Sequence, residues 1–322
     1  MPPKSSPLFT FRLIPAISAM LARRSIDAAV LLDDAGLPLD ALRGDVTAPL
    51  ERVQAFIERA AHELGTDVFG LQLADSLQGG AYGVAEFVVR SAPTCEAGLR
   101  ALCELAALIN PIGQFRFVTR ASGEGALHYA VTSERDTLGM HLNEYTLAYI
   151  VRQFRTIMDG ALPLVEAWFS HARKSNVDVL GKWFGCRLRF QAADCGFAIA
   201  PSVLARVPRT ADTLLFQFLL AQARAQLARI GPADIVTQVV RVLEARLPYG
   251  DLSAEAVAGA MAMKPRSLQR RLADAGTSYR DVLAHVRNRR RAELQSGGVA
   301  ESEIATQLGF SDARAMRRSL DH

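Results

Sequence analysis

Residues 251–276 are predicted to form two short helices separated by a tight turn, and this stretch constrains the fold more than any other. Ser253 is a suitable N-cap for the first helix, in which apolar residues recur at helical spacing as far as Met261. Pro265 begins the second helix, because proline is tolerated where its missing N–H would be unpaired anyway, and Gly276 ends it. The pattern predicts a helix-turn-helix.

One face of the second helix is apolar and the opposite face is basic. Leu268 and Leu272 are expected to face the core, and a rotation of about 100° per residue then places Arg266 and Arg270 on the other side. Arginine and glutamine side chains can bond base edges in a major groove, and arginine also neutralises phosphate. The free face therefore predicts contact with DNA, with a solvated basic surface as the alternative.

The same pattern returns near the end of the chain. Residues 303–308 predict another apolar helix, and Ser311 is expected to cap a following helix with outward-facing arginines at Arg314 and Arg318. Between the two pairs, residues 279–294 predict a connecting helix of roughly 24 Å at 1.5 Å per residue. With a helix radius at each end, this length approaches the ~34 Å between successive major-groove turns on one face of DNA. One chain could therefore contact two adjacent groove segments.

From residue 235 to its end, the chain resembles the DNA-binding region of the AraC/XylS family of bacterial transcription regulators, which pairs two helix-turn-helix units across a long helix. The segments that carry the resemblance are LSAEAVAGAMAM, PRSLQRRLADAGTSY, EIATQLGFSD and AMRRSL. The resemblance implies two sets of DNA-contacting residues: Arg266, Ser267, Gln269 and Arg270 in the first unit, and Arg314, Arg317 and Arg318 in the second. Lys264, which departs from the family pattern, is expected to meet a phosphate.

Three features depart from the family pattern. Lys264 and Ala300 stand where the family has a capping residue, and loss of a cap costs about 1 kcal/mol. The chain also ends at Asp321-His322, without the family's final helix. We therefore expect the second unit to be less stable than the first and to contribute mainly phosphate contacts. In an alternative interpretation, the chain is a ligand-binding or heterodimerising protein whose DNA binding is impaired because that helix is missing.

Charge and motifs narrow the function classes. The formal net charge is +4, and residues 250–322 hold 12 Lys and Arg against 9 Asp and Glu, so a difference of +3 lies in the region of the helix pairs. No HExxH, GxSxG, GxxxxGK or GxGxxG motif is present, and we expect neither enzyme activity nor a cofactor. His141 and Glu144 have the spacing of a metal pair, but two ligands are too few, and a solvated helix face is the alternative.

The region before residue 231 predicts a mixture of helices and strands. Residues 1–10 are expected to be a mobile leader. Helical spacing dominates residues 12–109, alternation at 115–119 and 126–132 predicts a β-hairpin, and residues 210–230 predict a long helix. No run of about 18 uncharged apolar residues and no signal-peptide core is present, which predicts a cytoplasmic protein without a membrane partner.

The segments LLDDAGLPLDAL, NEYTLAYIVR, FGCRLRF and VPRTADTLL resemble the amino-terminal effector-binding and dimerisation domain of the arabinose-binding-like branch of the same family, over about residues 25–229. Because Gly231-Pro232 breaks the chain, we expect an α+β sensor domain at 1–230 and an all-α double helix-turn-helix domain, shortened at its carboxyl end, at 231–322. A group of aromatic residues either lines an apolar ligand pocket or belongs to the core: Trp168, Phe169, Trp183, Phe184 and Phe190.

These expectations combine into a sequence-specific DNA-binding transcription regulator controlled by a small-molecule effector. Its expected partners are double-stranded DNA, a second copy of the chain, the effector and, if it activates transcription, RNA polymerase. The sequence does not identify the effector, the operator, the target genes or the direction of regulation.

Overall fold

The computed structural model of the protein describes residues 8–110, 113–131, 138–160, 162–230, 235–247, 251–261, 263–296 and 299–320. The chain forms two compact units, a larger one made of Phe9–Val46 and Glu51–Ala228 and a smaller one made chiefly of Arg229–His322. The predicted chain break at Gly231 and the first seven residues of the predicted leader lie outside the described ranges. No described helix is both long and apolar enough to cross a membrane.

The first part of the larger unit is mainly helical, as its apolar spacing predicts. Local caps fix where two of these helices begin: Asp27 accepts a hydrogen bond from the backbone N–H of Ala29 at 2.9 Å, and Thr94 accepts one from Ala97 at 3.1 Å. The helices are α1 (Ile14–Ala22), α2 (Ala28–Asp34), α3 (Leu50–Glu63), α4 (Phe69–Ser76), α5 (Gly83–Ser91), α6 (Cys95–Glu104) and α7 (Ala106–Ile109), with a 3-10 turn, η1, at Leu39–Leu42.

Two short strands within the first 50 residues of the chain are missing from the sequence prediction. β1 (Leu8–Phe11) and β2 (Val46–Pro49) pair into a two-stranded sheet. Each strand has four residues, which is too short for its alternation of polar and apolar residues to be recognised. The prediction that residues 8–10 belong to a mobile leader is therefore wrong, because they are part of β1.

A second, five-stranded sheet contains β3 (Gly113–Thr119), β4 (Gly125–Val131), β5 (Leu164–Trp168), β6 (Arg187–Arg189) and β7 (Cys195–Ile199), in the order β3-β4-β7-β5-β6. The predicted hairpin is confirmed, since β3 and β4 are antiparallel and Phe115 lies opposite Tyr129. β7 pairs antiparallel with both β4 and β5, and β6 runs parallel to β5 at the edge.

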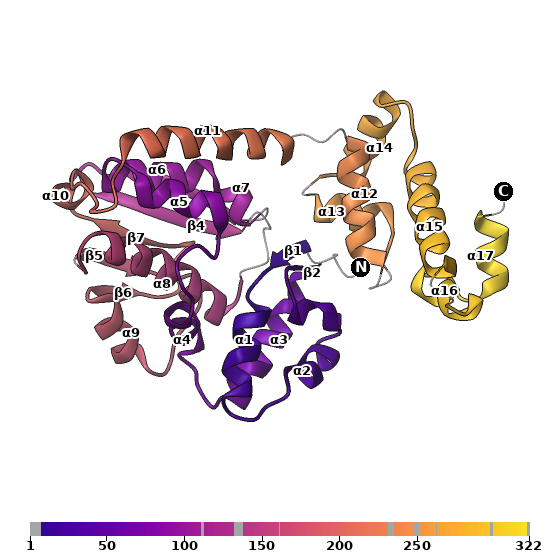
Figure 1. Cartoon of the computed structure of the whole chain (residues 1–322), viewed down its shortest axis with the longest axis horizontal. Helices are drawn as coiled ribbons and strands as arrows, with labels where there is room; N and C mark the ends of the chain where they lie inside the picture. The colour runs from indigo at the N-terminus through magenta and orange to yellow at the C-terminus, as the bar shows by residue number, and fades with distance from the viewer. Residues whose placement is uncertain are drawn as a thin grey trace. The chain divides into compact units, whose positions relative to one another are not determined.

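Helices cover both faces of this sheet. In Figure 1, α6 and α11 (Thr213–Ile230) lie on one side of the strands and α8 (Met140–Ile157) lies on the other, with the shorter α9 (Val177–Phe184) and α10 (Pro201–Leu204) nearby. Every residue of β7 is buried. A Cβ added at Gly196 in this strand would lie 2.2 Å from the Leu127 carbonyl oxygen and 2.4 Å from the Trp168 ring, so glycine is required there.

Helix α11 is apolar on two opposite sides. Phe216, Leu219 and Ala223 pack against α5 and α6. On the other side Leu214 is 80% exposed and Phe218 is 62% exposed. Large apolar side chains in solvent on a regular helix mark an interaction surface.

The described residues of the smaller unit from 235 to 320 are mainly helical and contain α12 (Ile235–Arg246), α13 (Ala254–Ala260), α14 (Pro265–Asp274), α15 (Tyr279–Ser296), α16 (Glu301–Gln307) and α17 (Ala313–Leu320). The two short helix pairs, α13–α14 and α16–α17, flank α15 in the chain, and α15 has 18 residues, or about 27 Å. Each of the six helices contributes at least one fully buried apolar side chain to a single cluster, including Val257, Leu268, Val286, Ile304 and Met316. Both pairs are therefore built on one core.

Candidate DNA-binding surface and ligand cavity

The basic face of α14 is exposed and its apolar face is buried. Leu268 and Leu272 are fully buried in the core of the smaller unit. The predicted DNA-contacting residues of this pair lie on the other side, exposed at Lys264, Arg266, Gln269 and Arg270 and half-buried at Ser267. The structure thus places these five residues at the N-cap and within about the first two turns of a single helix.

Both ends of α14 follow the sequence prediction. Lys264 is its N-cap residue and makes no capping hydrogen bond through its side chain. At the other end Gly276 has φ +76°, a left-handed conformation that glycine adopts without strain, and the backbone N–H of Thr277 donates to the Leu272 carbonyl oxygen at 3.0 Å.

The second pair also presents its arginines to solvent, but one of them is engaged. Arg314, Arg317 and Arg318 are exposed, and Met316 between them is fully buried. Arg317 forms a two-pronged ion pair with Glu301 at the start of α16, with Nε 3.1 Å from Oε1 and Nη2 2.5 Å from Oε2. Part of the charge on this face is therefore neutralised within the protein.

The prediction that Ser311 caps α17 is wrong. The side chain of the next residue, Asp312, accepts the hydrogen bond from the backbone N–H of Ala315 at 2.7 Å, and the Ser311 hydroxyl donates to that carboxylate at 3.3 Å. The bond from Ala315 holds the pKa of Asp312 below its ordinary value. At α16 the sequence prediction holds, because Ala300 is the N-cap residue and offers no side-chain cap.

Two arginines of α15, Arg287 and Arg289, contact neighbouring segments of the protein. Arg287 donates from Nε to the Leu308 carbonyl oxygen at 3.1 Å and stacks over the Phe310 ring at 4.2 Å, and its burial lowers its pKa. Arg289 is ion-paired with Glu244. These contacts hold α15 against its neighbours.

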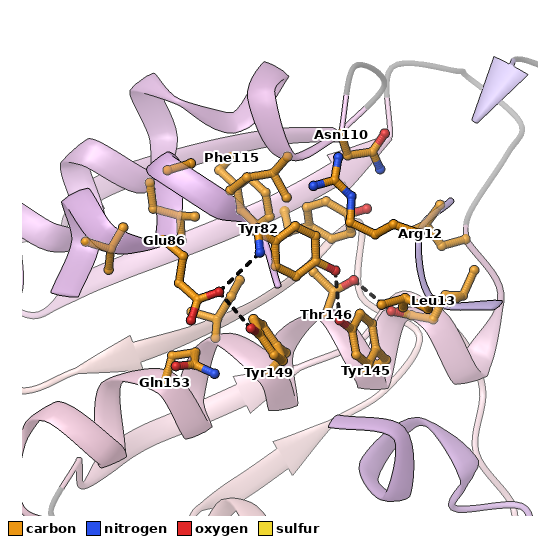
Figure 2. A pocket seen from close by; sticks show the side chains of 18 of the residues that line it. Arg12, Leu13, Tyr82, Glu86, Asn110, Phe115, Tyr145, Thr146, Tyr149 and Gln153 are labelled. Carbon is orange, nitrogen blue, oxygen red and sulfur yellow. Dashed lines mark hydrogen bonds between the residues drawn. The ribbon is translucent and has the colours of Figure 1, made fainter. Parts of the chain in front are cut away.

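A cavity of about 100 Å³ lies within the larger unit, between α5, α8 and the β3–β4 hairpin. Figure 2 shows aromatic rings closing around it. Its walls are mainly apolar and include Leu102, Phe115, Tyr129, Leu142, Tyr149 and Phe154. A mainly apolar cavity with a few polar groups in its walls is the usual form of a small-ligand site.

Most polar groups at the cavity already have partners. The hydroxyl groups of Tyr82 and Tyr145 lie 2.7 Å apart, and the Tyr149 hydroxyl donates to the Glu86 carboxylate at 2.8 Å. Glu86 also accepts from the backbone N–H of Gly80 at 2.6 Å. Burial raises the pKa of Tyr82 to about 12, so this hydroxyl remains protonated.

The cation at the cavity is Arg12. Its guanidinium lies over the Tyr82 ring, 5.2 Å from the centroid, as Figure 2 shows. Asp45 is its ion-pair partner at 3.7 Å, but that carboxylate is 56% exposed. The Nε atom of Arg12 is buried and has no hydrogen-bond partner among the described residues.

The aromatic residues proposed from sequence do not line this cavity. Trp168, Phe169 and Phe184 are buried in the core, where Phe169 stacks on Phe190 with ring centroids 5.6 Å apart. The lining residues differ from those predicted from the sequence, although Tyr145 and Tyr149 carry a signal. Two tyrosines four residues apart on an apolar helix face need partners for their hydroxyl groups, and such partners gather at polar sites.

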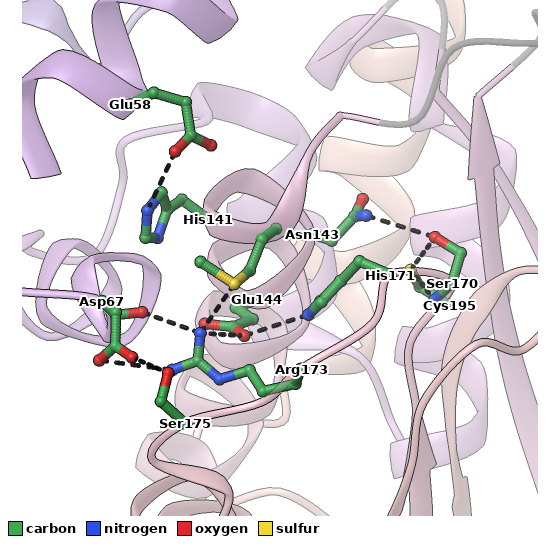
Figure 3. Close-up of polar contacts among 11 residues, drawn as sticks. Glu58, Asp67, His141, Asn143, Glu144, Ser170, His171, Arg173, Ser175 and Cys195 are labelled. Carbon is green, nitrogen blue, oxygen red and sulfur yellow. Dashed lines mark hydrogen bonds and ion pairs between the residues drawn. The ribbon is translucent and has the colours of Figure 1, made fainter.

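His141 and Glu144 belong to a buried polar network, shown in Figure 3. Glu144 is fully buried and lies 3.1 Å from His171 Nε2 and 3.2 Å from Arg173 Nη1. Burial, reinforced by the charge of Arg173, lowers the pKa of His141 to about 4. The expectation of a solvated helix face is therefore wrong, and among the described residues there is no group of three or more side chains suited to hold a metal.

Comparison with known proteins places the chain in a family. Residues 26–207 match the family described as the arabinose-binding domain of AraC transcription regulators, at their amino terminus. The HTH-type transcriptional regulator VirS of Mycobacterium tuberculosis is 29% identical over 266 residues, which cover 82% of this chain and 78% of VirS. The crystal structure of the transcriptional regulator CdpR from Pseudomonas aeruginosa shares 22% identity, with a TM-score of 0.49, and the match covers 95% of this chain and 92% of that one.

The matched segment 26–207 makes up more than half of the 322 residues and belongs mainly to the larger unit, in which the cavity lies. The resemblance noted in the sequence is thereby confirmed. The chain belongs to the AraC family of transcription regulators, in the branch whose amino-terminal part is the arabinose-binding domain.

Proposed function

We propose that the chain is a sequence-specific DNA-binding regulator in which α13–α14 and α16–α17 act as two helix-turn-helix units. The observation that carries this proposal is the division of α14 into a buried face, Leu268 and Leu272, and an exposed face with Arg266, Gln269 and Arg270. Arginine and glutamine are the side chains that bond guanine and adenine edges with two hydrogen bonds each. Residues 231–322 are then the DNA-binding domain, and residues 1–230 are the sensor domain.

The second unit is proposed to contact an adjacent groove segment. α15 is about 27 Å long, and with a helix radius at each end it approaches the ~34 Å between major-groove turns. Arg314 and Arg318 are exposed on α17 and available for this contact, while Arg317 is paired with Glu301. Phosphate contacts from this unit would position the chain, and base contacts from α14 would specify the sequence.

The test is selection of the intact protein against a pool of random duplexes at two salt concentrations. A double variant, Arg266→Ala with Arg270→Ala, removes the two arginines of the α14 face, and Arg23→Ala with Arg24→Ala removes two exposed arginines of the larger unit as the matched control. We expect enrichment of one motif by the wild type and the control and its loss in the first variant. Weak binding of all sequences with a steep salt dependence would contradict sequence-specific recognition.

Control by an effector is proposed to act through the cavity of the larger unit. The mainly apolar cavity between α5, α8 and the β3–β4 hairpin supports this assignment. A ligand that binds one arrangement of the protein better than another shifts the population toward it and thereby changes DNA affinity. If the regulator activates transcription, RNA polymerase is a further partner.

Self-association is proposed to use the exposed side of α11. Its first half carries large side chains at Leu214, Leu215 and Phe218, and its second half carries small exposed ones at Ala221 and Ala225. In an antiparallel pair with two-fold symmetry near Ala221, the large half of one helix lies against the small half of its partner. The surface is therefore complementary to itself, which favours a second copy of the chain as the occupant.

The oligomeric state tests this surface. Phe218→Glu should convert a dimer to a monomer in analytical ultracentrifugation, because it places a charge in the centre of the interface. Val179→Glu, at an exposed valine of α9, is the matched control and should leave the dimer intact. A wild type that is monomeric at tens of micromolar, or a Phe218→Glu variant that remains dimeric, would exclude α11 as the interface.

A further inference from the structure

We propose that the cavity binds a small monocarboxylic acid, with the carboxylate on Arg12 and an apolar body about the size of a benzene ring among the aromatic side chains. This inference rests on the effector-binding part of the proposed function and adds the chemical class of the ligand. It follows from the size of the cavity, from the partners of its polar groups and from the state of Arg12.

The size and walls of the cavity define the body of the ligand. Its volume is about 100 Å³, of the order of the engineered apolar cavities of about 150 Å³ that bind benzene. Phe115 and Tyr129 lie with their ring centroids 4.7 Å apart on one wall, and Tyr145 and Tyr149 lie 5.7 Å apart on another. A flat or branched apolar group fits between these two walls, and a long alkyl chain is too large for the volume.

The partners of the polar side chains exclude a ligand rich in hydroxyl groups. The hydroxyl groups of Tyr82 and Tyr145 bond each other, and that of Tyr149 bonds Glu86. Thr146 donates to the Leu142 carbonyl oxygen at 2.8 Å. A sugar would have to break these bonds to satisfy its own hydroxyl groups, and each group left unpaired costs about 1–3 kcal/mol of desolvation.

The hydrogen-bond partners of Glu86 likewise exclude a cationic ligand. Glu86, the buried carboxylate at the cavity, accepts from the backbone N–H of Gly80 and of Tyr82 and from the Tyr149 hydroxyl, and Arg90 lies 3.8 Å away. Its lone pairs and its charge are thus already compensated within the protein. An ammonium group would find no carboxylate free to receive it.

Arg12 differs from every other polar group considered at the cavity. Its Nε is buried without a hydrogen-bond partner among the described residues, and its one ion-pair partner, Asp45, is 3.7 Å away and more than half exposed. A carboxylate that bridges Nε and one terminal nitrogen satisfies both donors at once, which is the preferred geometry of an arginine–carboxylate pair. The Tyr82 ring beneath the guanidinium holds it in place for this contact.

Ligand-observed fluorine NMR on the full-length protein tests the class directly. The probes are 4-fluorobenzoate and 4-fluorobenzamide, which have the same ring and nearly the same shape and differ in charge. We expect saturable binding of the benzoate and at least about tenfold weaker binding of the amide. Excess 4-methylpentanoate should displace the benzoate, and excess arabinose should not.

Two variants test whether Arg12 binds the carboxylate of the ligand. Arg12→Gln should weaken binding of the benzoate by about tenfold or more and leave that of the amide unchanged, and Arg12→Lys should recover part of the loss. Arg24→Gln, at an exposed arginine outside the cavity lining, is the matched control and should bind as the wild type does. Circular-dichroism melting of each variant establishes that it is folded.

Three results would overturn the inference: equal binding of benzoate and amide, wild-type binding of benzoate by a folded Arg12→Gln variant, or no binding of either probe at millimolar concentration. The proposed function fails separately, in the duplex selection, because the fluorine experiment contains no DNA. Binding of the acid without any effect on DNA affinity would leave the ligand class standing and remove control through the cavity.

Discussion

The two helix pairs of the smaller unit share one sequence pattern, but they are fixed in opposite ways. In the first pair the cap is on the first helix, where Ser253 accepts from the backbone N–H of Ala256 at 3.1 Å, and α14 begins at Lys264 without one. In the second pair α16 begins at Ala300 without a cap, and Asp312 caps α17. The helix that carries the arginines is therefore uncapped in one pair and capped in the other.

The arginines themselves differ in the same comparison. Within the described residues no ion pair to Arg266 or Arg270 is found, whereas Arg317 is bound by Glu301. A common pattern of apolar and basic residues has thus produced one fully available face and one that is partly occupied by the protein's own carboxylate. We expect the first face to read bases and the second to position the chain.

The largest expected effect is the loss of stability when an apolar side chain of each helix pair is shortened. Leu272→Ala removes a fully buried side chain and should cost about 2–5 kcal/mol. Leu320→Ala, at a half-buried residue at the end of α17, should cost about 1 kcal/mol. Hydrogen exchange of α14 and α17 peptides in the full-length protein measures both losses. Equal protection of the two helices in the wild type would remove the expectation that the second pair is less stable.

The next effect separates base contacts from phosphate contacts. Arg270→Ala should lower affinity for the selected DNA site by about 1–3 kcal/mol and relax the preference at one position. Arg318→Ala, at an exposed arginine of α17 that is available for phosphate contact, should weaken binding to all sequences alike and reduce the salt slope by about 1. Fluorescence anisotropy with the selected and a scrambled duplex distinguishes these outcomes. Identical behaviour of the two variants would contradict the division between base contacts and phosphate contacts.

A smaller effect comes from exchanging the caps. Ser253→Ala should destabilise the smaller unit by about 1 kcal/mol, because the N–H of Ala256 loses its acceptor. Lys264→Ser should stabilise α14 by a similar amount while removing a cation from its exposed start. Urea denaturation followed by circular dichroism measures both changes, and a destabilised Lys264→Ser variant would show that the lysine holds α14 in another way.

The smallest effect is a difference in acid sensitivity between the caps. The folded-state pKa of Asp312 is lowered by the hydrogen bond from Ala315, so its contribution is present above the ordinary aspartate pKa of about 3.9 and is lost as pH falls through the folded value. Ser253 does not titrate. Hydrogen-exchange protection of α17 should therefore decline between pH 5 and pH 3 more than that of α13. Asp312→Ser should abolish the difference, and its persistence in that variant would assign it to another group.

The helices and the β3–β4 hairpin follow from the local spacing of apolar residues, and the sequence therefore predicts them well. The burial of Leu268 and Leu272 and the exposure of Arg266 and Arg270 depend only on helical periodicity within ten residues. The position of a cap depends on a single residue, which is why Ser311 is predicted where Asp312 acts. Element boundaries are set by such single hydrogen bonds, and periodicity does not report them.

The cavity could not be predicted in the same way, because its walls come from distant parts of the chain. Arg12 precedes α1, Tyr82 precedes α5, Phe115 is in β3 and Tyr145 is in α8. Within its own helix, strand or loop, none of these residues stands out from the local pattern of polar and apolar positions. Only the packing of the elements brings the four together. The aromatic residues between Trp168 and Phe190 are close together in the sequence, but they pack around β5 and β6 and not at the cavity. Their clustering in the sequence therefore does not indicate the ligand site.

The packing of Trp168 beside Gly196 has a consequence for spectroscopy. The chain has two tryptophans, Trp168 and Trp183, and both lie in the larger unit. Trp168 is buried, and its indole N–H donates to Asp194 at 2.7 Å. Tryptophan emission therefore reports on the larger unit alone, whereas the far-ultraviolet signal of the helices comes from both units. Coincident melting curves from the two signals indicate that the units unfold together, and separated curves give the stability of each without cutting the chain.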